Sequence, residues 1–330
     1  MIKKLLLIFL LTYPQFSYSN VENDFNIWLN KFKIRALEKG ISEETINNSF
    51  KNTKYLEQVI KYDRYQPEFF EDTKTYLNKR ATRSRMLKAK TLLIKNQKLF
   101  DEVEKEFNVE KELLLALWGI ETNFGKHVGK MNIISSLATL GFDKRRSEFF
   151  SKQLIILLKL IDQKLIDVDT LYGSWAGAFG NFQFMPSAIE KYAIDYDKNG
   201  KIELKKSLHD AVASAANYIT KIGWNYKSSC FHKVKLTRPI SEKYINVSAK
   251  KIKNYLTIKS WKEQGIVDIQ QINDKYKAAL IIPDLAVPEG NMNSPAFLVF
   301  GNYEKILKWN RSLRFGVTVC TLANMIRNEI

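Results

Sequence analysis

Cysteine and histidine are scarce in this chain of 330 residues, which contains two cysteines and three histidines. Cys230 and Cys320 can form at most one disulfide, and their spacing leaves open whether they pair or remain two buried free thiols. The histidines are scattered, with no cysteine or carboxylate beside them at a spacing typical of metal ligands. We therefore expect no zinc site.

The apolar stretch at the start of the chain is far shorter than the roughly 20 residues that a membrane span needs. It runs from Leu5 to Leu11 behind Lys3 and Lys4, and Ser17–Ser19 supplies small residues after it, a pattern typical of a secretory signal peptide. No cysteine lies near this cleavage site, so the sequence offers no point for N-terminal lipid attachment. We expect a soluble, exported protein that begins near Asn20, with an uncleaved anchor as the alternative.

Basic residues outnumber acidic ones. With 52 Lys and Arg against 35 Asp and Glu, the net charge is +17, or +15 without Lys3 and Lys4. Such an excess indicates an anionic partner, and export favours an acidic cell-wall polymer over nucleic acid. The alternative is that the lysines only keep the protein soluble, since they are spread along the chain. A hydrophobic fraction of 45% and an aromatic fraction of 12% argue against disorder.

Hydrophobic periodicity predicts helices over the first part of the chain, from about residue 24 to residue 108. Ser42 is placed to cap a short helix, and a long basic helix is expected from about Thr73 to Phe107. An apolar helix from Glu110 to Phe124 and an amphipathic helix from Arg146 to Ile166 follow. Beyond Trp224 the pattern changes to short strands with turn residues between them. The predicted strands are Lys233–Thr237, Tyr244–Val247, Ala278–Pro283 and Ala296–Phe300, and a terminal helix is expected over Phe315–Arg327.

Glu121 is the only acid between Glu112 and Asp143, and it stands at the end of the apolar helix. Leu117 and Phe124 fall on or near its helical face. A carboxyl held against such a face should lose solvation, and its pKa should rise. An acid that stays protonated near neutral pH can protonate a leaving-group oxygen, as cleavage of a glycosidic bond requires. The alternative is a glutamate at a helix end that points to water.

The segment Gly173–Pro186 combines three glycines, several aromatic residues and one glutamine ahead of a helix that starts near Pro186. Glycines let the backbone approach a ligand closely or bend sharply. We interpret the segment as one wall of a cleft. The alternative is a tight turn between helices with a hydrophobic tether.

The segment Asp195–Glu203 has the spacing of the start of a calcium loop. Side-chain oxygens fall at alternate positions, in Asp195, Asp197 and Asn199. Gly200 stands at the sharp turn, but the twelfth position, where a bidentate acid is needed, is Lys206. Glu203 or Asp210 could substitute for it. The alternative is a turn held by its own side-chain hydrogen bonds.

Taken together, these segments resemble the lytic murein transglycosylase B family of periplasmic enzymes that cleave peptidoglycan. The likeness covers nearly the whole mature chain, and the order and spacing of its motifs are specific. The motifs are Asp63–Phe69, Ala116–Gly125, Leu137–Leu140, Arg145–Arg146, Gly173–Pro186, Ala216–Tyr218, Gly223–Trp224 and Trp309–Ser312.

The resemblance implies a mainly α (α+β) fold with a lysozyme-like helical catalytic core, an N-terminal helical region and a small β-containing module. The implied divisions are a signal peptide (1–19), the N-terminal helical region (20–108), the core (109–226) with an EF-hand-like loop (195–210), a mixed α/β module (227–308), and a C-terminal segment whose helix packs back on the core (309–330).

The resemblance also implies roles for individual residues. Glu121 would be the single catalytic acid and base, and the glycan or its peptide would be bound by Ser174, Gln183, Arg145, Arg146, Tyr218 and Asn310. No cofactor is required, but Asp195, Asp197, Asn199 and Asp210 would hold a structural calcium ion. In two places the chain departs from the family, because Trp309 and Phe315 stand where tyrosines are usual. A hydroxyl that could orient the glycan is therefore missing.

The implied reaction is the non-hydrolytic cleavage of the β-1,4 bond between N-acetylmuramic acid (MurNAc) and N-acetylglucosamine (GlcNAc), which yields 1,6-anhydro-MurNAc. One carboxyl suffices because no water attacks, whereas most glycosidases need two. The alternatives are a hydrolytic muramidase and a non-catalytic peptidoglycan-binding protein. We expect glycan strands as the partner of a monomeric periplasmic enzyme, with cell-wall synthesis proteins as candidate further partners and no nucleic acid.

Overall fold

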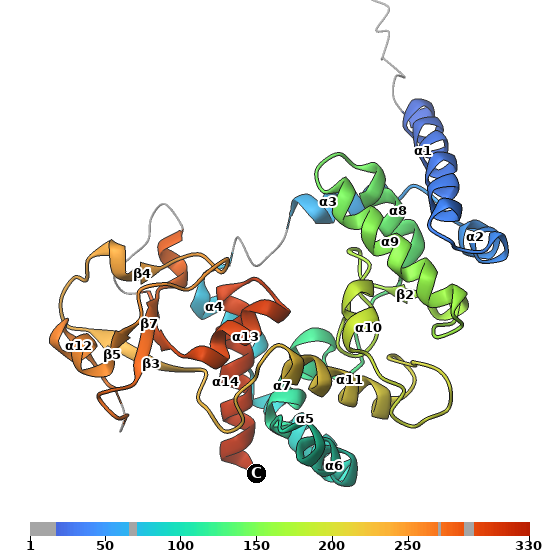
Figure 1. The fold of residues 1–330 in the computed structure, drawn as a ribbon. Helices are drawn as coiled ribbons and strands as arrows, with labels where there is room; N and C mark the ends of the chain where they lie inside the picture. The colour runs from blue at the N-terminus through green and yellow to red at the C-terminus, as the bar shows by residue number, and fades with distance from the viewer. Residues whose placement is uncertain (1–17, 66–70, 270–271, 287–293) are drawn as a thin grey trace, which may run out of the picture.

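The computed structural model describes residues 18–65, 71–269, 272–286 and 294–330 (Figure 1). Residues 1–17 of the predicted signal peptide (1–19) and the end of the Asp63–Phe69 motif lie outside these ranges, whereas Tyr18 and Ser19 belong to α1. The helices are α1 (Tyr18–Glu38), α2 (Glu43–Phe50), α3 (Glu57–Arg64), α4 (Thr73–Arg80), α5 (Arg83–Lys95), α6 (Gln97–Phe107), α7 (Lys111–Thr122), α8 (Ile133–Phe142), α9 (Ser147–Asp162), α10 (Pro186–Tyr192), α11 (Leu208–Lys221), α12 (Ile258–Glu263), α13 (Gly301–Trp309) and α14 (Leu313–Glu329). Across the described ranges, no helix is both long enough and apolar enough to cross a membrane.

The helices form two groups joined by α10 (Figure 1). In the first group, α8 packs against α9, α1 and α3. In the second, α14 packs against α4, α5 and α7, and α11 packs against α6. Because α10 contacts both α9 and α11, it connects the two groups next to the glycine-rich segment.

The strands are β1 (Met131–Asn132), β2 (Tyr172–Gly173), β3 (Phe231–Leu236), β4 (Ile245–Asn246), β5 (Leu256–Thr257), β6 (Ile266–Val267), β7 (Lys277–Ile281) and β8 (Ala296–Val299). Strands β1 and β2 form an antiparallel pair, and the others form a sheet of order β4-β7-β8-β3-β6, with β5 also on β7. Alternate residues of β7 and β8 face opposite sides. Leu280 and Leu298 pack towards Trp261 of α12, whereas Ile281 and Phe297 pack towards α13 and α14. Both faces of this sheet are therefore covered.

The basic segment Thr73–Phe107 is three helices, so the prediction of one long helix is wrong. Thr82 caps α5, because its side chain accepts a hydrogen bond from the backbone N–H of Arg85. Asn96 ends α5 with its own N–H bonded to the carbonyls of the last turn. By contrast, the predicted cap of α2 is confirmed, since the Ser42 side chain accepts from the N–H of Thr45.

Cys230 and Cys320 form a disulfide, which resolves the question that the sequence left open. It links the residue before β3 to α14, and therefore ties the β-containing module to the helical body. Asp284 makes a second tie, because its carboxylate accepts hydrogen bonds from the backbone N–H of Thr73 and from Arg314.

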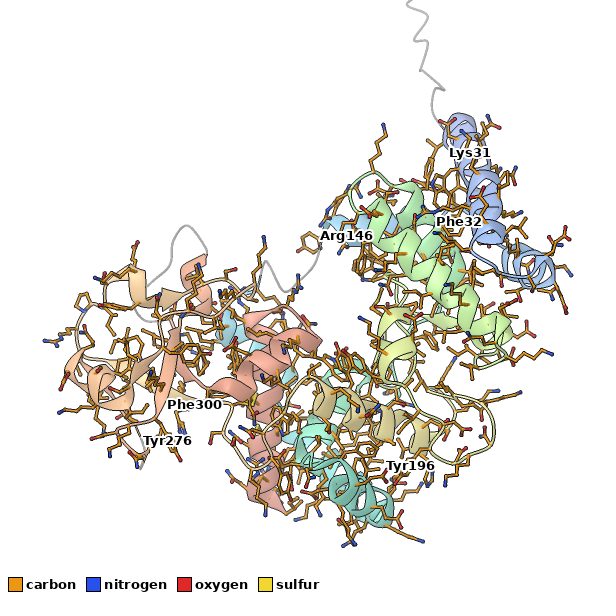
Figure 2. The ribbon with its side chains drawn as sticks, viewed as in Figure 1. Lys31, Phe32, Arg146, Tyr196, Tyr276 and Phe300 are labelled. Atoms are coloured by element: carbon orange, nitrogen blue, oxygen red, sulfur yellow. A yellow bond between two sulfur atoms is a disulfide. The ribbon has the colours of Figure 1, made fainter. Side chains whose placement is uncertain are left out.

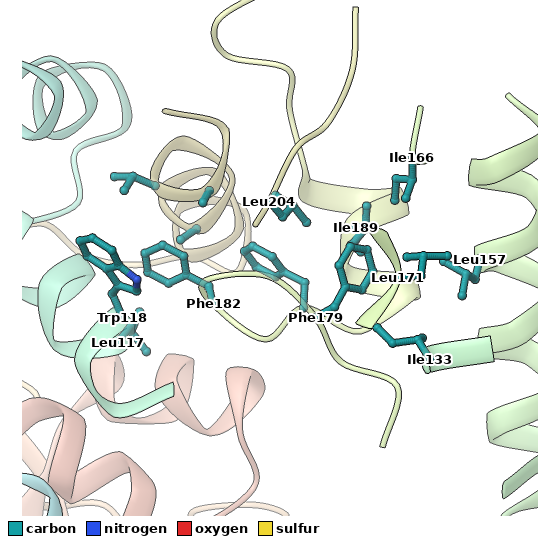
Figure 3. Packing of buried hydrophobic residues seen from close by; sticks show 14 of the residues in the cluster. Leu117, Trp118, Ile133, Leu157, Ile166, Leu171, Phe179, Phe182, Ile189 and Leu204 are labelled. Carbon is teal, nitrogen blue, oxygen red and sulfur yellow. The ribbon is translucent and has the colours of Figure 1, made fainter. Parts of the chain in front are cut away.

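The largest hydrophobic cluster extends from α7 through the glycine-rich segment to α8 and α9 (Figure 3). Trp118 stacks on Phe182, with ring centroids 6.4 Å apart, and Phe179 of the same segment lies beyond Phe182 in the figure. Leu113 to Leu117 are at most 2% exposed, so α7 is buried on all its sides over these residues. This burial fixes the position of the helix that carries Glu121.

Candidate active site

Glu121 lies in the last turn of α7, where the buried helix ends and its side chain becomes partly exposed. Asn123, Phe124 and Gly125 follow with φ values of 51°, 60° and 78°. The N–H of Asn123 bonds to the carbonyl of Gly119, and this closure satisfies the end of the helix. The chain thus turns away directly after Glu121 and leaves its carboxyl at the edge of the core.

Trp309, at the end of α13, contacts Glu121 directly. Its indole Nε1–H donates a hydrogen bond of 2.8 Å to Glu121 Oε1. The indole stacks on Tyr218 of α11 with centroids 4.8 Å apart, and Tyr218 stacks on Tyr192 of α10 at 4.2 Å. Three helices therefore contribute to an aromatic column, here defined as Tyr192, Tyr218 and Trp309, that ends at the carboxyl of Glu121.

Tyr218 is fixed within this column by its two stacking partners and by a hydrogen bond from its hydroxyl. Its hydroxyl donates a hydrogen bond of 3.2 Å to the carbonyl of Lys308, the residue before Trp309. Burial raises the pKa of Tyr218 to about 12, so the phenol stays neutral at physiological pH. Asn310 directly follows the column and ends α13, with its N–H bonded to the carbonyl of Ile306.

Ser174 and Gln183 both stabilise the glycine-rich segment from within. Ser174 Oγ accepts a hydrogen bond of 3.0 Å from the N–H of Ala178. Gln183 has a φ of 52°, and its side-chain amide donates to the carbonyls of Val128 and Gly180. Both side chains remain partly exposed. Their hydrogen bonds shape the segment, and their predicted contact with a glycan stays a prediction.

Asn181 connects the end of α7 to this segment, and the sequence analysis did not identify it. The side chain is 7% exposed, and its Oδ1 accepts a hydrogen bond of 3.0 Å from Trp118 Nε1. Its Nδ2 donates to the carbonyls of Leu204 and Lys205, and its backbone carbonyl accepts from Thr122 Oγ1. Since Trp118 and Thr122 flank Glu121 on α7, Asn181 fixes the turn that carries the carboxyl.

Arg145 and Arg146 share one acidic partner, Asp63 of α3. Arg145 Nη1 lies 2.9 Å from Asp63 Oδ2, and Arg146 donates to Asp63 Oδ1. The Asp63 side chain is 1% exposed, whereas the two arginine side chains are 45% and 37% exposed. Arg146 also lies over the ring of Phe150, and Figure 2 shows Arg146 on the side of its lobe that faces the second group of helices. The buried Asp63 therefore fixes both guanidinium groups, and the exposed parts of the two arginine side chains form a cationic surface.

Asp195, Asp197 and Asp210 come together, with one carboxylate oxygen of each within 4.8 Å of the others. Gly200 takes the sharp turn with a φ of 88°, and its N–H donates to Asp195. Asp210 is fully buried and accepts from the N–H groups of Tyr196 and Glu203. Three carboxylates at this distance suit a hard cation with oxygen ligands.

A carboxyl at the end of a buried helix, beside an aromatic column and on a mainly helical frame, is the arrangement of a lysozyme-like protein. The chain belongs to the transglycosylase SLT domain family, whose model matches residues 24–324.

Solved structures of related proteins confirm the predicted fold. SltB3 from Pseudomonas aeruginosa in complex with NAG-NAM-pentapeptide is 30% identical, with a TM-score of 0.82 over 92% of this chain and 79% of that chain. The Escherichia coli lytic transglycosylase Slt35 in complex with calcium is 23% identical, with a TM-score of 0.76 over 93% of this chain and 94% of that chain, and supports the fold alone.

A curated relative adds a local match in sequence. Membrane-bound lytic murein transglycosylase B of Escherichia coli K12 is 40% identical over 119 residues, which is 36% of this chain. The match spans 33%, or about a third, of the length of that relative.

Proposed function

We propose that the protein is a peptidoglycan lytic transglycosylase that cleaves the β-1,4 bond between MurNAc and GlcNAc without water. The observation that carries this proposal is Glu121 itself, a single carboxyl at the end of a buried helix with one oxygen held by Trp309. The crystallised relative SltB3, which is complexed with NAG-NAM-pentapeptide and with NAG-anhNAM-pentapeptide, supports this substrate class.

In the proposed reaction, Glu121 acts twice. As an acid it gives its proton to the glycosidic oxygen, and the bond between that oxygen and C1 of MurNAc breaks. The N-acetyl oxygen of the substrate stabilises the positive charge that develops at C1. As a base, the Glu121 carboxylate then takes the proton of the C6 hydroxyl while O6 attacks C1. The ring that closes is 1,6-anhydro-MurNAc, and the glutamate regains its starting proton.

The remaining polar residues would bind and orient the glycopeptide. Arg145 and Arg146 present cationic groups that suit a carboxylate of the peptide stem. Tyr218 lies between Tyr192 and Trp309, so it would meet the glycan with the edge of its ring, and Asn310, Ser174 and Gln183 offer polar contacts. The basic charge of the chain and its predicted export suit an anionic wall polymer in the periplasm. Proteins of cell-wall synthesis are candidate further partners.

We further infer that Asp195, Asp197 and Asp210 bind a structural calcium ion, with Asn199 as a further oxygen ligand. Calcium should raise the melting temperature of the protein, and magnesium should do so less, because Ca²⁺ accepts irregular oxygen coordination whereas Mg²⁺ demands near-ideal octahedral geometry. Asp197→Asn should abolish the calcium response. An equal melting temperature with calcium and with chelator would contradict this site and leave the proposed reaction untouched.

The proposed reaction is tested by digesting purified peptidoglycan with the protein and measuring the masses of the soluble products by mass spectrometry. Transglycosylase products are one water lighter than those of a muramidase, and a binding protein releases none. Glu121→Gln keeps an oxygen that can accept from Trp309, so the fold should persist while turnover falls by about a thousandfold or more. Glu112→Gln on the same helix is the matched control and should retain activity. A Glu121→Gln variant that still cleaves would rule out the assignment.

A further inference from the structure

In the hydrogen bond between Trp309 and Glu121, Trp309 can act only as the donor. An indole N–H can donate but cannot accept, whereas a tyrosine hydroxyl can do both. The Glu121 oxygen that accepts from the indole, Oε1, therefore cannot carry a proton directed at Trp309 while the bond is intact. When Glu121 is protonated, the acidic proton belongs on the other oxygen, Oε2.

Trp309 is also held firmly enough to impose this choice. Its indole stacks on Tyr218 with an interplanar angle of 23°, and Phe184 and Phe182 lie with centroids 5.5 Å and 6.4 Å from it. The bond from the Tyr218 hydroxyl to the carbonyl of Lys308 fixes the backbone next to the indole. Rotation of the indole away from Glu121 would disrupt these ring contacts, so its direction is set by packing.

The geometry points to Trp309 as a positioning residue that assigns both proton transfers to Oε2 of Glu121, an inference that rests on the proposed function. After the acid step Glu121 is an anion. A hydrogen bond donated to a carboxylate is stronger than the same bond donated to a neutral carboxylic acid. Trp309 therefore stabilises the carboxylate during the interval between proton donation and removal of the C6 hydroxyl proton. It also fixes the carboxyl group through Oε1, so the same oxygen, Oε2, would serve in both steps.

The test replaces Trp309 by Phe, which keeps an aromatic ring in the stack and removes the donor. We expect kcat to fall about 10- to 100-fold, because a hydrogen bond to a charged group is lost, while KM changes little. The basic limb of the pH profile of kcat/KM should move to higher pH, because the carboxylate form of Glu121 loses its donor. Trp309→Tyr restores a group that can donate, and its kcat should lie between those of the wild type and the Phe variant.

Trp224→Phe is the matched control, because Trp224 Nε1 donates a bond of 2.7 Å to another glutamate, Glu110. This variant loses the same kind of bond away from Glu121 and should keep the wild-type pH profile. A Trp309→Phe variant with wild-type kcat and pH profile, beside an inactive Glu121→Gln variant, would overturn this inference alone. An active Glu121→Gln variant would instead overturn the proposed function, which keeps the two failures distinct.

Discussion

Replacement of Asn181 by alanine tests whether the end of α7 is held in place by this one side chain. The change removes three hydrogen bonds, one from Trp118 Nε1 and two to the carbonyls of Leu204 and Lys205. The Leu204 carbonyl keeps its bond from the backbone N–H of Asn181, and Lys205 is exposed, so Trp118 Nε1 is the buried group that loses its partner. The free energy of unfolding should therefore fall by about 1–3 kcal/mol, the cost of one unsatisfied buried group.

The matched control is Asn246→Ala in the β-containing module. Asn246 is also 7% exposed and also makes three side-chain hydrogen bonds, to the N–H and carbonyl of Lys253 and to the carbonyl of Leu280. Urea unfolding should give similar losses of stability for the two variants. Only Asn181→Ala should lower kcat on peptidoglycan, because Trp118 and Thr122 flank Glu121. Equal activities of the two variants, or a stability loss below about 1 kcal/mol for Asn181→Ala, would refute this reasoning.

Three further perturbations test the frame around the site. Reduction of the Cys230–Cys320 disulfide opens a loop with a sequence separation of 90 and should lower the free energy of unfolding by about 4–5 kcal/mol, measured by urea titration with and without dithiothreitol. An unchanged midpoint would contradict this. Burial raises the pKa of Glu112 in the folded protein, so its ionisation opposes folding as the pH rises through that pKa. Glu112→Gln should therefore raise the melting temperature at pH 8 and change it little at pH 4, whereas the reverse pattern would show that the charge is stabilising. Gly129 has a φ of 89°, and an added Cβ would lie 2.0 Å from a facing backbone oxygen, so Gly129→Ala should cost more than about 3 kcal/mol. Gly40→Ala, with a φ of 80° and open space, should cost only about 1 kcal/mol in the same unfolding assay, and equal costs would exclude a steric cause.

The sequence predicts the elements of the fold well where a local signal exists. Ser42 supplies an N-cap, and the buried leucines of α7 supply a clear helical pattern. The single helix predicted over Thr73–Phe107 is wrong because local caps divide the segment into α4, α5 and α6. Thr82 begins α5 through a side-chain cap, and Asn96 ends it through its backbone N–H. Hydrophobic periodicity carries no signal for either bond.

For the candidate site, the sequence indicates Glu121 but does not predict the hydrogen bonds that Asn181 and Trp309 make to its helix. Asn181 and Trp309 bond to α7 across separations of 63 and 188 residues. Asp63, the anchor of both predicted arginines, acts across 82 residues from Arg145. Such pairs have no periodicity or spacing that a single sequence can reveal, since only the folded chain brings them together. The signal for Asn181 is its polar side chain within an otherwise apolar and glycine-rich segment.

Trp309 shows why the identity of a residue is not enough to judge a departure from a family pattern. From the sequence, the exchange of tyrosine for tryptophan is the loss of a hydroxyl. In the structure, the indole N–H is bonded to Glu121 Oε1, so a donor is present at the carboxyl and only the capacity to accept is missing. In the proposed reaction, in which one carboxyl first gives and then takes a proton, a useful neighbour stabilises the anion and does not compete for the proton. A donor that cannot accept meets both requirements, so the exchange at Trp309 is compatible with the two-step use of Glu121.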